Sequence, residues 1–178
     1  MSTGTKTRTT QILAIMNVIA WMAFIGYAIN AGAILTSYVV SWFNPNASKN
    51  MYLQLNKNVL EQYSFLQYTM SISFMFAILC IKAQIALLVT RVLGKVNLEN
   101  PFKTRVALAL EKISYLLITI ATLAFLANAH TDWLQKRTGI EGDKLTTQEI
   151  LVTAGLVFII SQIFRRGVEL QAESDLTV

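Results

Sequence analysis

Four long apolar segments dominate this chain and limit what it can fold into. They cover residues 12–43, 65–93, 113–129 and 150–164. A helix that crosses the hydrocarbon core of a bilayer needs about 20 mostly apolar residues, and the two shorter segments reach that length with their neutral flanking residues. Because the backbone must satisfy its own hydrogen bonds in lipid, each segment is predicted to be a helix. Thr146 and Glu149 fit a capping box that would open the last helix.

The composition agrees with a lipid environment. Hydrophobic residues make up 54% of the chain and charged residues 14%, whereas a typical soluble domain carries about 25% charged residues. We therefore predict an all-α, integral membrane four-helix bundle, with one membrane domain over residues 1–178. The transmembrane helices are expected at about 18–43, 65–90, 108–129 and 147–164, the cytoplasmic loop at 91–107 and the cytoplasmic tail at 165–178.

The positions of Lys and Arg predict the orientation of the helices. Nine of these residues fall on the side that carries both termini and five on the other side, while Lys82 lies within the second segment. Cytoplasmic loops of membrane proteins carry the excess of positive charge. Both termini are therefore expected in the cytoplasm, in a multi-pass protein of the inner (cytoplasmic) membrane.

The first apolar segment is longer than one upright crossing requires. Trp21 and Trp42 are 21 residues apart, which corresponds to about 31 Å in a helix. This length matches a hydrocarbon core of about 30 Å, and tryptophan favours both membrane–water boundaries. The spacing predicts a crossing between the two tryptophans, with residues 12–19 lying along the inner surface of the membrane as an amphipathic stretch. The alternative is that Trp21 packs against a neighbouring helix.

Lys82 is the candidate functional charge within an apolar segment, because ionisable side chains inside membranes are costly and often functional. If the crossing ends at Ile81, the ammonium group reaches the inner headgroups, and Ala83–Leu93 continues as a helix at the surface. If the crossing covers Tyr68–Leu88, the ammonium group is submerged and needs a partner. The interiors of the four segments contain no Asp or Glu, which favours the first interpretation.

The sequence offers little support for catalysis or cofactor binding. His130 is the single histidine and lies at the outer end of the third segment, whereas a metal site needs three or four converging donors. Cys80 is the single cysteine, and its apolar surroundings favour an unreactive thiol. We therefore expect no enzymatic activity, no metal site and no cofactor.

Two short motifs resemble a known family. They lie in the cytoplasmic loop and in the tail, and with the four spans they are similar to the bacterial membrane family called domain of unknown function 2975. Members of that family are often encoded beside a small helix-turn-helix regulator of the Cro/C1 type, so the resemblance implies a membrane partner for such a regulator. The motif residues are Asn100, Pro101 and Phe102 in the loop, and Phe164, Arg165, Arg166, Gly167, Glu169, Leu170, Gln171, Asp175 and Leu176 in the tail.

The charges of the tail are compatible with docking. Glu169 and Glu173 are four residues apart and share one face of a helix. Together with Asp175 they form an anionic end behind the cationic pair Arg165–Arg166. The tail is expected either to point into the cytosol or to fold back onto the basic loop. Both a solvated helix end with an internal salt bridge and a docking surface for a basic partner fit this pattern.

The sequence therefore leaves three classes of function open. The first is an uncharacterised membrane protein that binds and regulates a small cytoplasmic helix-turn-helix transcription factor. The second is a small transporter or channel with Lys82 facing an anion path, and the third is a structural or assembly subunit. The lipid bilayer is a further expected partner, and a homo-oligomer is compatible with the sequence. Direct nucleic-acid binding is not expected, because the basic residues lie between apolar segments.

Overall fold

The computed structural model describes residues 3–43, 64–94, 103–139 and 144–176, with side chains from residue 8 to residue 173 of these ranges. Every regular element within them is an α-helix, which confirms the predicted all-α class with four apolar helices. The predicted loop motif Asn100–Phe102 lies outside the described residues. The helices are α1 (Thr3–Phe43), α3 (Phe65–Leu93), α4 (Thr104–Thr138) and α5 (Gln148–Leu176).

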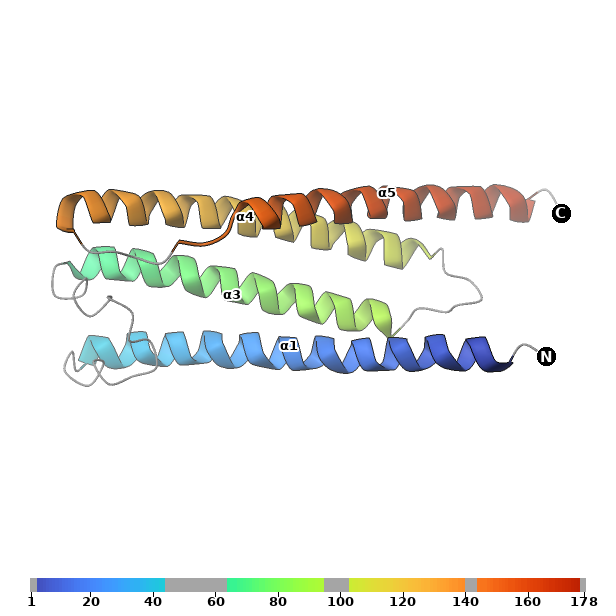
Figure 1. The fold of residues 1–178 in the computed structure, drawn as a ribbon, viewed down its shortest axis with the longest axis horizontal. Coiled ribbons are helices and arrows are strands. Elements are labelled where there is room, and N and C mark those ends of the chain that lie inside the picture. Colours follow the sequence, from blue (N-terminus) through green and yellow to red (C-terminus); the bar gives the residue numbers. More distant parts are fainter. Residues whose placement is uncertain (1–2, 44–63, 95–102, 140–143, 177–178) are drawn as a thin grey trace.

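The helices pack against one another in chain order, α1 on α3, α3 on α4 and α4 on α5. Consecutive helices run in opposite directions, so the first residues of α1 and the last residues of α5 lie at the same end of the molecule (Figure 1). We call this the termini end and the opposite end the loop end. All four helices are long and apolar enough to cross a membrane.

The first helix differs from its predicted form. α1 is continuous and straight from Thr3 to Phe43 (Figure 1), so residues 12–19 do not turn to lie along a membrane surface, and that prediction is wrong. Trp21 is 45% exposed, and its ring meets the ring of Phe24 on the same helix edge to face. The unbroken hydrogen bonding of a helix explains the difference, since the stretch contains no glycine or proline that would bend it.

The second helix is also straight, and α4 has a defined end. The stretch Ala83–Leu93 is helical as expected, and Ala86 and Thr90 within it are buried. The position of this stretch relative to the membrane surface stays a prediction. α4 ends at Gly139, whose φ of 70° is left-handed and whose N–H donates to the Gln135 carbonyl oxygen at 2.9 Å. Glycine adopts this conformation without the clash that a Cβ would cause, and it is the common way for a helix to stop.

Candidate functional site

The tail motif continues α5 beyond the start of α4. The Ser114 hydroxyl of α4 donates to the Ala154 carbonyl oxygen of α5 at 3.0 Å, which fixes the register of these antiparallel helices. Ten residues back along α4 is Thr104, and ten residues forward along α5 is Phe164. The residues from Phe164 to Leu176 therefore project past the first turn of α4 by about 18 Å, as Figure 1 shows at the termini end.

The projecting segment presents a mixed charged and apolar surface. Arg165, Arg166 and Glu169 are exposed, and Leu170 is 52% exposed. Arg166 Nη1 lies 2.9 Å from Glu169 Oε2, an ion pair between residues three apart. The tail is thus a continuation of α5 with an internal salt bridge, and its predicted contact with the basic loop involves residues 95–102, which lie outside the described residues. Phe164, Gly167 and Gln171 are half-buried, while Asp175 and Leu176 belong to the last turn of α5 and their side chains are not described.

Small residues let α4 and α5 approach closely. Ala107, Ser114 and Ala121 are buried and recur every seven residues along α4, so they share one face. Ala154 and Ser161, which are also seven residues apart, are buried on α5. We call these five residues the α4–α5 seam. A side chain can reach the backbone of a neighbouring helix, as Ser114 does, only where the two helix axes are close. Such small residues are typical of helix contacts in lipid.

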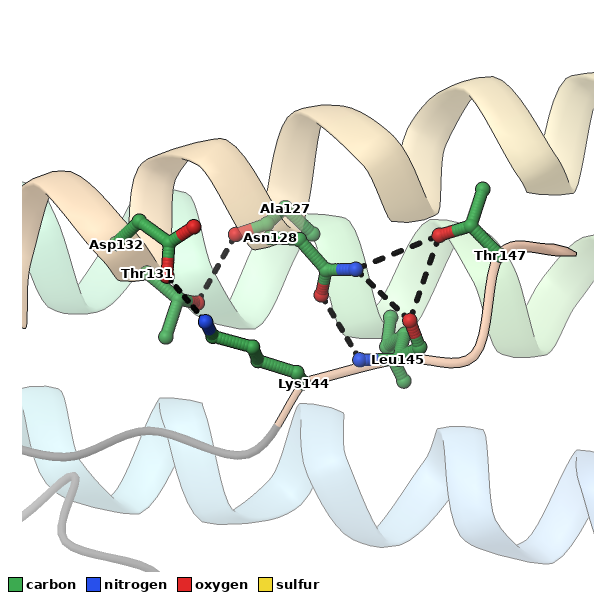
Figure 2. Close-up of polar contacts among 7 residues, drawn as sticks. All are labelled: Ala127, Asn128, Thr131, Asp132, Lys144, Leu145 and Thr147. Atoms are coloured by element: carbon green, nitrogen blue, oxygen red, sulfur yellow. Dashed lines mark hydrogen bonds and ion pairs between the residues drawn. The ribbon is translucent and has the colours of Figure 1, made fainter.

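Asn128 holds the chain just before α5 against α4 (Figure 2). Its Oδ1 accepts from the Leu145 N–H at 2.8 Å, and its Nδ2 donates to the Leu145 carbonyl oxygen at 2.8 Å. Nδ2 also lies 3.4 Å from Thr147 Oγ1. We call this arrangement the Asn128 bracket. The bracket gives a hydrogen-bond partner to both the N–H and the carbonyl group of Leu145, which lies outside the helices. Backbone groups left unpaired away from water are costly.

The structure differs from the predicted start of the last helix, and the Asn128 bracket itself was not predicted. α5 begins at Gln148, one residue later than a capping box with Thr146 as its first residue requires, and Thr147 is the residue that contacts Asn128. Sequence reasoning missed Asn128, although an amide within a predicted apolar helix was a usable signal. Nearby, Lys144 Nζ lies 2.7 Å from Asp132 Oδ1 at the loop end.

His130 joins α4 to α3 at the loop end. Its Nε2 lies 2.8 Å from Gln67 Oε1, and its ring lies near the rings of Phe74 and Trp133. Arg137 stacks on Trp133 with its guanidinium carbon 4.8 Å from the ring centroid. Within the described ranges, His, Cys, Asp and Glu form no group of three that could hold a metal ion. The contacts of His130 are those of a residue that connects two helices.

Lys82 faces α1. Its Nζ lies 5.9 Å from the centroid of the Tyr27 ring, which is a cation–π contact. Lys82 is 17 residues from Phe65, the residue that meets Trp42 of α1, and nine residues from Arg91. In a helix these separations are about 26 Å and 14 Å. The ammonium group therefore lies between two helices and closer to the termini end, and none of the ion pairs among the described residues includes it.

The four long apolar helices define a multi-pass membrane protein. A profile of the family described as "Protein of unknown function (DUF2975)" matches residues 53–178, and the chain belongs to this family. The match includes both predicted motifs and the helices α3, α4 and α5, while α1 lies before it. Neither the curated proteins nor the solved structures gave a match.

Proposed function

We propose that the protein is a non-enzymatic, multi-pass protein of the cytoplasmic membrane whose tail docks a small helix-turn-helix transcription regulator. The observation that carries this proposal is the projection of Phe164–Leu176 beyond the first turn of α4. The excess of Lys and Arg at the termini end predicts that this end faces the cytoplasm. The projecting helix is then accessible to a soluble partner.

The exposed side chains of the projecting helix suit a basic partner with an apolar contact. Glu169 and Glu173 are exposed and share one face, and Leu170 lies beside Glu169. A cation on the partner would compete with Arg166 for Glu169. Because surface ion pairs contribute only about 0 to 1 kcal/mol, this exchange costs little, and burial of Leu170 adds to the affinity.

The length of α5 gives the proposed signalling a mechanical basis. A single helix links the Asn128 bracket to the tail motif. A ligand or membrane change at the loop end would move α4 and α5 together relative to α1 and α3, because the α4–α5 seam joins these two helices. The tail would then be presented or withdrawn, and the regulator held or released.

Co-purification tests this function. The full chain with a tag at its N-terminus is expected to retain a small helix-turn-helix protein, identified by mass spectrometry after extraction in mild detergent. A variant with Glu169→Gln, Leu170→Ala and Glu173→Gln is expected to lose that protein. The matched control carries Asp132→Asn, Leu151→Ala and Glu149→Gln, which likewise remove two carboxylates and one leucine, from exposed or half-exposed positions elsewhere. Equal recovery with both variants would refute tail docking, as would the absence of such a protein from the wild-type sample.

Lys82 supports a second candidate, a small transporter or channel for anions. The supporting observation is an ammonium group held between α1 and α3 beside Tyr27. Anion flux into proteoliposomes is expected to be lost with Lys82→Ala and kept with Lys82→Arg, because a path for anions needs the charge. Flux that is unaffected by Lys82→Ala would rule out the path at this residue. The third class, an assembly subunit, would be favoured if crosslinking captured only other membrane proteins.

A further inference from the structure

Three cations lie on α3 and α4 toward the termini end. Arg91 is in the last turn of α3, Arg105 is in the first turn of α4, and Lys112 lies two turns further along α4. All three are exposed. We propose that this cluster, the Arg91–Arg105–Lys112 flank, binds the headgroup of an anionic phospholipid whose acyl chains lie along α3 and α4.

The helical geometry places the three cations on one side of the α3–α4 pair. Ile78 and Ile85 of α3 pack in one cluster with Ile120 of α4, and the buried Ile113 lies seven residues before Ile120, on the same face of α4. With about 100° per residue, Arg91 is turned by about 120° from Ile85, and Arg105 and Lys112 are turned by about 80° and about 100° from Ile113. The rotation has the same sense in both helices. Since the helices are antiparallel, rotations of the same sense lead to the same side.

The positive charge of this flank is not neutralised by the described residues. The ion pairs formed among them involve Lys144 with Asp132 at the loop end and Arg166 with Glu169 on α5. Glu111 is the nearest acid along α4, but it is turned by about 100° from Lys112, and its Oε1 accepts from the Tyr115 hydroxyl at 3.4 Å. Three cations that face no carboxylate of a described residue attract an anion, and a phosphate diester supplies one fixed negative charge with oxygens for Arg and Lys.

The surface beside the cations is apolar, which favours a lipid over a soluble anion. Leu88 of α3 and Leu116 of α4 are half-buried on this flank, nearer the middle of the helices than the cations are. Leu108 lies between Arg105 and Lys112 and is 57% exposed. A headgroup on the cations would place acyl chains over these side chains. Basic clusters between membrane helices at the cytoplasmic side recognise anionic headgroups in this way.

Native mass spectrometry of the detergent-purified full chain tests the proposal. Phosphatidylglycerol is expected to bind more tightly than phosphatidylcholine. Each cation near a membrane surface contributes roughly a fivefold gain in affinity for anionic lipid, so the variant R91Q/R105Q/K112Q should bind phosphatidylglycerol on the order of a hundredfold more weakly. The matched control K136Q/R137Q/K144Q removes the same charge at the loop end and should keep the affinity.

Several results would overturn the lipid site. These are equal affinity for the two lipids, a triple variant that binds like the wild type, and a control variant that loses as much. Displacement by an equal concentration of glycerol phosphate would assign the flank to a soluble anion. If the triple variant does not fold, the single variants Arg91→Gln and Lys112→Gln should each lose roughly fivefold, and Arg91→Lys should keep binding. This test does not use co-purification of the regulator. The docking function can therefore be refuted while the lipid site is confirmed.

Discussion

The two outer pairs of helices are joined by different chemistry. α4 and α5 meet through the small residues of the α4–α5 seam, with a hydroxyl that reaches the backbone of the other helix. α1 and α3 meet through rings. Tyr38 and Tyr68 stack with centroids 6.1 Å apart, and Trp42 and Phe65 meet edge to face at 5.3 Å. We call these four rings the aromatic seam. Ile34 and Ile72 are buried beside it.

This difference indicates which pair can change shape. A seam of small residues has no side chains that could rearrange, so a larger residue must separate the backbones. An aromatic seam consists of side chains that can shift, and lipid can replace part of the packing because acyl chains are as apolar as the rings. We therefore expect α5 to be fixed to α4 while α1 is the more adaptable helix.

The largest expected effect is at the centre of the α4–α5 seam. Ala154 is 1% exposed, so Ala154→Leu forces α5 away from Ser114 and should lower the free energy of unfolding by about 3 kcal/mol. Unfolding in mixed detergent micelles measures this change. Gly155→Leu is the control, because a Cβ at Gly155 meets nothing within 4 Å. Equal losses in the two variants would mean that the seam is not closely packed.

A smaller effect is expected at the Asn128 bracket. Asn128→Ala leaves the N–H and C=O of Leu145 without their partner, and a part-buried group left unpaired costs about 1–3 kcal/mol. Hydrogen exchange at the start of α5 should also become faster. Asn30→Ala on α1 is the matched control, because the Asn30 side chain is exposed. Unchanged exchange at residues 145–150 in the Asn128 variant would show that the bracket does not hold α5.

The smallest effect is expected in the aromatic seam. The Tyr38 hydroxyl lies 3.2 Å from Thr69 Oγ1, and Tyr38→Phe removes only this hydrogen bond. Such bonds between membrane helices contribute about 0.6 kcal/mol on average, so unfolding should shift by about that amount. The double-mutant cycle with Thr69→Val isolates the pair. A loss as large as that of Ala154→Leu would contradict the adaptable character of the aromatic seam.

The four helices could be predicted from the sequence, whereas their contacts could not. The lengths of the apolar segments and the need to satisfy the backbone in lipid predict helices directly. Contact faces are harder to predict, because side chains that face lipid are as apolar as those that face protein. Ile29 and Val152, for example, are 65% and 64% exposed, although a soluble protein would bury such residues. The periodicity of apolar residues therefore does not predict which face of a membrane helix contacts another helix.

Some signals of the site were nevertheless in the sequence. The seven-residue spacing of Ala107, Ser114 and Ala121 marks a face on which another helix can pack closely, and Asn128 marks a point where a backbone needs hydrogen bonds. The straight course of α1 was harder to predict, because the same tryptophan spacing fits a helix that bends at the membrane and one that continues. Projection of the tail motif required the register given by Ser114 and Ala154.

Labelling of single cysteines tests the central claim, that the chain crosses the membrane four times with both termini on one side. In a Cys80→Ser background, cysteines at Arg8, Ala172 and Lys136 are accessible positions, since all three residues are exposed. A reagent that cannot cross the membrane should label the first two from the same side and Lys136→Cys from the other side. Labelling of Ala172→Cys and Lys136→Cys from the same side of intact cells would contradict the account.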